Sequence, residues 1–375
     1  MTIDRRDFMA LAAGAATVAA GPVSAAQSGD SLKGWIVVNA LGGLGDPNHP
    51  SDSLVPNLSP RVLAEAHASG LTMVNVTLGY VSGPDDPFEA SVRDIAETDR
   101  LIRDHAADVT KILSVADIRR AKADGKIGLL YGFQNGAMMG EEAGRVDIFA
   151  DLGVRVFQLT YNPSNQLGDG SMAPGNRGLT PFGREVIARL NDRRVMVDLS
   201  HSGEQTCLEA AKVSRAPISI NHTGCRALVD LPRNKTDAEL RLVAERGGFV
   251  GIYFMPFLNA SGHARAEDVV AHIDHAVNVC GEDHVGIGTD GDVTQIDDLD
   301  AYQKQLADEI AKRRAAGISA AGERPDTYPF VVDLRGPDQF RKLARLLAAK
   351  GYSSRRVEKI MGENFLRYAE AIWGG

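Results

Sequence analysis

Residues 195–222 read VMVDLSHSGEQTCLEAAKVSRAPISINH and contain the repeating unit of the chain. Two short apolar runs, 195–200 and 217–221, flank a longer stretch, and each run ends directly before a histidine, His201 or His222. Such runs are typical of strands that are buried on both faces of a parallel sheet. Side chains that follow neighbouring parallel strands lie at the same edge of the sheet, so we expect the two histidines to be close together.

The same unit recurs along the chain, with amphipathic helical stretches between the apolar runs. One helix start is marked by Ser59, which suits an N-cap, and by Pro60, which fits the first helical turn. Strand and helix alternating eight times predict a closed (β/α)8 barrel of the TIM type. A doubly wound open sheet is the alternative, but no glycine-rich phosphate fingerprint follows the first run. The eight runs are Trp35–Asn39, Thr72–Leu78, Ile127–Phe133, Val154–Thr160, Val195–Ser200, Pro217–Asn221, Phe249–Phe254 and His284–Thr289.

The length of 375 residues fits one large barrel domain over residues 27–375. The stretch of about 292–336 is long for a barrel loop and holds a charged helical piece, Asp300–Ala315. We interpret it as an insertion after the last strand, on the face that carries the active site. The tail to Trp373 is expected to form two helices, the second starting near Ser353.

Bulk composition restricts the function classes. The chain is 44% hydrophobic and 24% charged, which is typical of a globular protein, and its formal net charge is −8. No basic cluster offsets this charge, so neither a nucleic-acid footprint nor a patch for anionic membranes is predicted. The three cysteines allow at most one disulfide.

The first 26 residues read as a twin-arginine export signal. Arg5 and Arg6 precede a small, alanine-rich apolar run, and a small-residue cleavage site follows near Ala26. The run is short for a membrane span, which needs about 20 strongly apolar residues. We therefore expect the mature protein to be periplasmic or secreted, without a membrane span.

Residues just past the carboxyl ends of barrel strands form the active site of this fold. Two imidazoles and a carboxylate among them suffice to hold a catalytic zinc with an open position. Elsewhere, His272 and His275 are expected on a solvated helix face, His284 on the opposite end of the barrel, and Cys225 as a small buried hydrophobe. The strand-end residues are Leu41, Gly43, Gln134, Tyr161, His201, His222 and Asp290.

These segments resemble the membrane (renal) dipeptidase family of zinc peptidases, over about residues 35–368. The most specific stretches are GLTPFGREVIARLNDRRVMVDLSH (178–201), PISINHTGCRALVDLPRN (217–234), DHVGIGTD (283–290) and ENFLRY (363–368). The resemblance implies that His201 and His222 bind one zinc, that Asp290 is the catalytic carboxylate, and that Arg233 binds substrate. It also implies a small peptide or amide substrate, and family members are often homodimers.

The chain departs from the family pattern at the other zinc. The family has a His-x-Asp pair after the first strand, where this chain has Leu41 and Gly43. The bridging glutamate is replaced by Gln134, and a histidine that touches substrate by Tyr161. An amide can give an oxygen to one metal but lacks the charge to bridge two. We therefore expect one zinc per chain rather than two, with Asp290 and Gln134 as further ligand candidates. Asp46 or His49 are the alternative donors at the first position.

Three functions remain open from the sequence. The first is a zinc-dependent dipeptidase-like hydrolase of dipeptides or related small amides, with a reduced, single-metal site. The second is a catalytically impaired pseudoenzyme that binds a small peptide or a partner. The third is other chemistry at a two-histidine, one-carboxylate site, which also suits non-haem iron.

Overall fold

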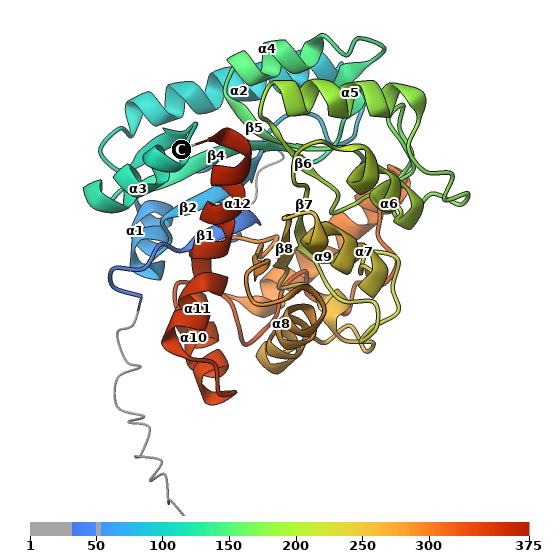
Figure 1. Cartoon of the computed structure of the whole chain (residues 1–375). Helices are drawn as coiled ribbons and strands as arrows, with labels where there is room; N and C mark the ends of the chain where they lie inside the picture. Colours follow the sequence, from blue (N-terminus) through green and yellow to red (C-terminus); the bar gives the residue numbers. More distant parts are fainter. Residues whose placement is uncertain (1–31, 50–53, 375) are drawn as a thin grey trace, which may run out of the picture.

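The computed structural model describes residues 32–49 and 54–374, and the expected export signal lies outside them. Eight parallel strands form a nearly closed barrel in the order β1-β2-β4-β5-β6-β7-β8-β9, so the predicted (β/α)8 fold is confirmed. Figure 1 shows helices around the outside of the strands, with α2, α4 and α5 together at the top of the view. The strands are β1 (Val38–Gly42), β2 (Met73–Thr77), β3 (Val109–Ile112), β4 (Ile127–Phe133), β5 (Val154–Gln158), β6 (Met196–Asp198), β7 (Ser219–Thr223), β8 (Phe249–Ile252) and β9 (Val285–Ile287).

The helices begin where local sequence supplies capping groups. The Ser59 hydroxyl accepts the backbone N–H of Val62 at the start of α1, and Thr236 and Glu239 form a reciprocal capping box on α7. Ser353 caps α11 as the sequence predicts. The helices are α1 (Pro60–Ser69), α2 (Pro87–Asp104), α3 (Val115–Asp124), α4 (Arg145–Asp151), α5 (Pro181–Asp192), α6 (Glu204–Val213), α7 (Asp237–Glu245), α8 (Ala266–Cys280), α9 (Leu299–Ala315), α10 (Gln339–Ala349), α11 (Ser354–Glu358) and α12 (Asn364–Trp373).

The sheet holds one strand that the sequence reading missed. β3 pairs with the first half of β4, from Val109 opposite Ile127 to Ile112 opposite Leu130, whereas β5 pairs with its second half. The first strand is also displaced: β1 runs from Val38 to Gly42 rather than from Trp35 to Asn39. Leu41 therefore lies within the strand and not past its end.

Side chains help to close the barrel between its first and last strands. The Asn39 amide donates to the Thr289 hydroxyl at 2.8 Å and accepts the Thr289 backbone N–H at 2.7 Å. Beside it, the Asp290 N–H donates to the Leu41 carbonyl at 2.9 Å. A second main-chain bond runs from the Gly43 N–H to the Gly291 carbonyl at 3.3 Å, so the edge between β1 and β9 is closed by an amide side chain together with two main-chain bonds.

One expectation about the histidines outside the site is wrong. His272 is only 1% exposed, and both ring nitrogens are satisfied inside the protein: Nε2 donates to the Leu258 carbonyl and Nδ1 accepts the Cys225 N–H. His275 is half-buried and contacts Asp237. The Cys225 side chain is fully buried, as the sequence predicts. Among the described residues no helix is long and apolar enough to cross a bilayer.

Candidate active site

Neighbouring strands bring His201 and His222 together. His201 follows β6 by three residues and His222 lies inside β7, whose end was predicted two residues too early. Their ring centroids are 4.9 Å apart with the planes tilted by 58°. Both rings are buried, and burial, with a contribution from the Arg233 charge, lowers the pKa of each well below the ordinary value. Both imidazoles are therefore neutral at pH 7, the state that a metal ligand needs.

The tautomer of His201 is set by Asn162. The Asn162 amide nitrogen donates to the Ile318 carbonyl at 2.8 Å, which turns its oxygen toward His201 Nδ1 at 2.7 Å. Because that oxygen only accepts, Nδ1 carries the proton and Nε2 keeps its lone pair. Tyr161 stacks on the ring with centroids 4.2 Å apart. His201 is thus held in the orientation and tautomer of a ligand that binds through Nε2.

His222 has no hydrogen-bond partner on either ring nitrogen among the described residues. Its side chain is fully buried, and only its backbone N–H is engaged, by the Ser200 hydroxyl at 3.1 Å. A buried polar group without a partner costs about 1–3 kcal/mol. An imidazole left in this state beside a second one is the kind of donor that a bound cation would satisfy.

Asp290 follows β9 by three residues and occupies a strained backbone position. Its φ of 59° lies in the left-handed region, which is uncommon for residues other than glycine and is tolerated best by asparagine and aspartate. Here the N–H bond to Leu41 holds the turn. Burial raises the pKa of Asp290 to about 6, although the charges of Arg233 and Arg313 act in the opposite direction. A carboxyl with that pKa is ionised at neutral pH and is a competent proton acceptor.

Arg233 is buried beside His201 and is only 1% exposed. Its Nη1 donates to the Ser200 carbonyl at 2.6 Å and its Nη2 lies 3.3 Å from His201 Nε2. The guanidinium also lies 5.8 Å from the Tyr253 ring centroid. In this arrangement Arg233 contacts the lone pair of His201.

At the position after β1, where the family resemblance implies the ligands of a first metal, the chain has no side chain that could bind a metal. Leu41 is 2% exposed, and a Cβ added to Gly43 would lie 2.4 Å from Oδ1 of Asp292. The space of a side chain at residue 43 is therefore filled by the Asp292 carboxylate. Gln134 turns its amide nitrogen to the Thr77 hydroxyl at 2.6 Å. Leu41, Gly43, Gln134, Tyr161 and Asp290 all line one cavity of about 700 Å³, whereas His201, His222 and Arg233 do not line it.

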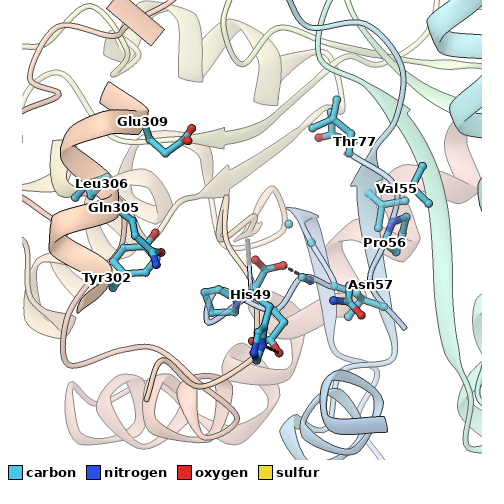
Figure 2. A pocket seen from close by; sticks show the side chains of 18 residues that line it. His49, Val55, Pro56, Asn57, Thr77, Tyr302, Gln305, Leu306 and Glu309 are labelled. Carbon is cyan, nitrogen blue, oxygen red and sulfur yellow. Dashed lines mark hydrogen bonds and ion pairs between the residues drawn. The ribbon is translucent and has the colours of Figure 1, made fainter. Parts of the chain in front are cut away.

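A second cavity of about 390 Å³ adjoins the first, between α9 and the loop after β1. Figure 2 shows Tyr302, Gln305 and Glu309 reaching in from α9, opposite Asn57 and Val55. Asp46 and His49, the alternative ligands, line this cavity and bond each other at 3.1 Å. Nothing in the described chain brings them to His201 or His222.

Few side chains in this region could act as metal ligands. Over residues 32–49 and 54–374 no group of three or more histidines, cysteines or carboxylates stands close enough to hold a metal. What remains is a pair of imidazoles, one with its lone pair oriented and one unpartnered. Arg233 Nη2 would have to yield its contact with His201 Nε2 for a metal to enter.

The membrane dipeptidase family model, peptidase family M19, matches residues 61–320. The chain belongs to this family. Its members are metal-dependent hydrolases of dipeptides, which establishes the class of enzyme to which the chain is related.

Three relatives illustrate the likeness. The chain is 31% identical over 279 residues to Dipeptidase tcpJ of Claviceps purpurea, which covers 73% of this chain and 56% of that protein. An amidohydrolase from Pseudomonas aeruginosa superposes with a TM-score of 0.79 at 31% identity, over 93% of this chain and 99% of its own. A metallopeptidase from Rhodobacter sphaeroides, liganded with a phosphinate mimic of L-Ala-D-Ala, shares the fold with a TM-score of 0.70 at 20% identity, over 90% and 99% of the two chains.

Sequence reasoning missed three polar residues of this region: Asn162, Asp292 and Arg313. Asn162 directly follows Tyr161, and Asp292 stands two residues after Asp290, so closeness to residues already singled out was a usable signal. Arg313 is one of three successive basic residues on α9, with Lys312 and Arg314, and nothing in the sequence separates it from its neighbours. Only the fold places it beside Tyr161.

Proposed function

We propose that the protein is a dipeptidase-like hydrolase of dipeptides or related small amides that works with a single zinc ion on His201 and His222. The observation that supports the metal is the pair of orphaned, fully buried ring nitrogens of His222 beside the oriented Nε2 of His201. The observation that supports a single ion is the occupation of the residue 43 position by Asp292.

Each residue of the site has a distinct task in this proposal. Bound zinc supplies a Lewis acid that polarises the scissile carbonyl and acidifies water. Asp290, with its pKa near 6, takes the proton of the attacking water and passes it to the leaving amine. Asn162 keeps the His201 lone pair available. Tyr161 stacks on His201 and lines the substrate cavity.

The binding of the substrate carboxylate by Arg233, which the family resemblance implies, stays a prediction. Arg233 lies against His201 and is buried, so this role requires the guanidinium to move toward substrate.

A pseudoenzyme that binds a small peptide is the second candidate. It is favoured by the absence of any three-ligand group in the described chain and by the buried Arg233 cation, which disfavours a second positive charge nearby. Iron chemistry at the two histidines and Asp290 is the third, and metal analysis separates it from the others.

Metal content of the purified protein, measured by plasma mass spectrometry alongside dipeptide hydrolysis, tests these candidates. One zinc per chain is expected, lost in His201→Ala and in His222→Ala. His275→Ala is the matched control, because His275 pairs with Asp237 on an outer helix and should keep zinc unchanged. No metal and no turnover would refute the hydrolase and favour the pseudoenzyme, two zincs would refute the single-metal site, and iron would point to the third candidate.

We also propose export through the twin-arginine pathway, supported by Arg5 and Arg6 ahead of the apolar run. Such a route would deliver the protein folded to the periplasm or the medium.

A further inference from the structure

Among the charged side chains that line the larger cavity, six are acidic and two are arginines. Arg93 and Arg313 are the cations of its wall. Arg93 is already paired, with Asp85 at 3.1 Å and Asp94 at 3.9 Å. Arg313 comes from α9, whereas most of the wall comes from strand ends and the loops that follow them. The acidic residues of the lining are Asp85, Asp94, Glu97, Asp290, Asp292 and Glu309.

Arg313 is held in place on one side and open on the other. Its Nε and Nη2 donate hydrogen bonds to the Glu323 carboxylate at 3.2 and 2.8 Å, and Nη2 also lies 3.3 Å from the Tyr161 hydroxyl. No acceptor in the described chain lies within hydrogen-bond reach of Nη1. The side chain is 30% exposed, in a wall that includes Asp290 and Gln134. Arg313 therefore offers a fixed, charged donor to whatever occupies the cavity.

Arg233 does not offer such a donor in this arrangement. Both of its terminal nitrogens are engaged, by the Ser200 carbonyl and His201, and it lies outside the wall of the cavity. An anion in the cavity would meet Arg313 without any rearrangement of the protein.

We propose that Arg313 binds the free carboxylate of the substrate and thereby makes the site select small peptides with an unblocked C-terminus. The assignment rests on the proposed function for the kind of substrate. Nη1 donates to the carboxylate, while Glu323 and Tyr161 fix the guanidinium plane. The carboxylates of the same wall attract the ammonium group at the other end of the peptide. The wall thus offers groups of both charges to a zwitterion.

Calorimetric binding of L-Ala-L-Ala and of its C-terminal amide tests the assignment. The measurement uses zinc-loaded protein carrying Asp290→Asn, which prevents turnover during titration. A charge-assisted hydrogen bond contributes about 1.5–3 kcal/mol, so the free acid is expected to bind roughly ten- to a hundredfold more tightly than the amide. Adding Arg313→Gln should abolish this preference, whereas Arg313→Lys should keep part of it, because the charge remains without the planar fork. Arg93→Gln removes a cation from the same cavity and should leave the preference intact.

The results separate this inference from the proposed hydrolysis. A preference that survives Arg313→Gln, or that depends on Arg233 alone, overturns the assignment. So does the absence of any preference, or of any binding, in the Asp290→Asn parent. Loss of the preference in Arg313→Gln, with an unchanged melting temperature, supports the assignment. Failure of the wild type to hydrolyse any dipeptide would refute the proposed function but not this assignment.

Discussion

The substitution Gly43→Asp, which restores the family's aspartate, should destabilise the protein and should not restore the first metal position unless Asp292 is removed as well. The Cβ of a Gly43→Asp side chain would lie 2.4 Å from Asp292 Oδ1, closer than real contacts allow. Asp292 cannot move freely, because the same oxygen accepts the Gly45 N–H at 2.7 Å. Displacing it breaks a hydrogen bond to a charged group, worth about 1.5–3 kcal/mol, and brings two carboxylates together. We therefore expect Gly43→Asp to destabilise the metal-free protein by about 2–3 kcal/mol.

A double-mutant cycle with Asp292→Ala measures this clash. Denaturant unfolding of chelator-treated protein should show a favourable coupling of about 2 kcal/mol between the two substitutions. Gly291→Ala is the control, since a Cβ there meets nothing within 4 Å and stability should stay within about 0.5 kcal/mol of wild type.

The same clash governs metal stoichiometry. Leu41→His, Gly43→Asp and Gln134→Glu together should still bind one zinc, and adding Asp292→Ala should raise the content toward two. The reasoning is refuted if Gly43→Asp alone is as stable as wild type, or if the triple variant binds two zincs with Asp292 in place.

Further predictions concern single positions. His222→Leu should abolish zinc binding yet stabilise the metal-free protein by about 1–3 kcal/mol, because it removes two unpartnered buried nitrogens; lower stability would contradict this. Since burial raises the folded pKa of Asp290 to about 6, its ionisation opposes folding, so stability is lost as pH rises from about 4 through 6. Asp290→Asn should therefore stabilise the metal-free protein by up to about 3 kcal/mol at pH 7.5 and hardly at pH 4. An equal effect at both pH values would exclude ionisation of Asp290 as the cause of the stabilisation. Changing Arg5 and Arg6 to lysine should leave precursor in the cytoplasm on immunoblots of cell fractions, and normal export would disprove the signal.

The barrel could be predicted because its strands are visible in the sequence as short, continuous apolar runs. Buried parallel strands need apolar side chains on both faces, and seven of the eight expected runs overlap strands nearly in register. β3 escaped notice because Thr110 and Lys111 interrupt its apolar pattern, and Lys111 is accommodated by Asp99 and the Leu152 carbonyl. β1 was placed three residues early because Trp35 and Ile36 extend the apolar run beyond the paired strand.

The site was predictable only where it follows strand order. His201 and His222 could be paired from the sequence, since adjacent parallel strands end at one edge. The occupation of the residue 43 position by Asp292, and the approach of Arg313 to Tyr161, depend on how loops and an inserted helix fold back over the barrel. Such contacts join residues far apart in the chain and leave no local pattern.

The seam between Asn39 and Thr289 bears on how the chain folds. The two residues are 250 positions apart, and every hydrogen bond between β1 and β9 has a similar sequence separation. Contacts this distant carry a large loop-closure entropy and form late. During synthesis, β1 cannot pair with β9 until more than three quarters of the protein has left the ribosome. Barrel closure is therefore a late event in folding, and until then the unpaired edge of β1 is a site at which chains could aggregate.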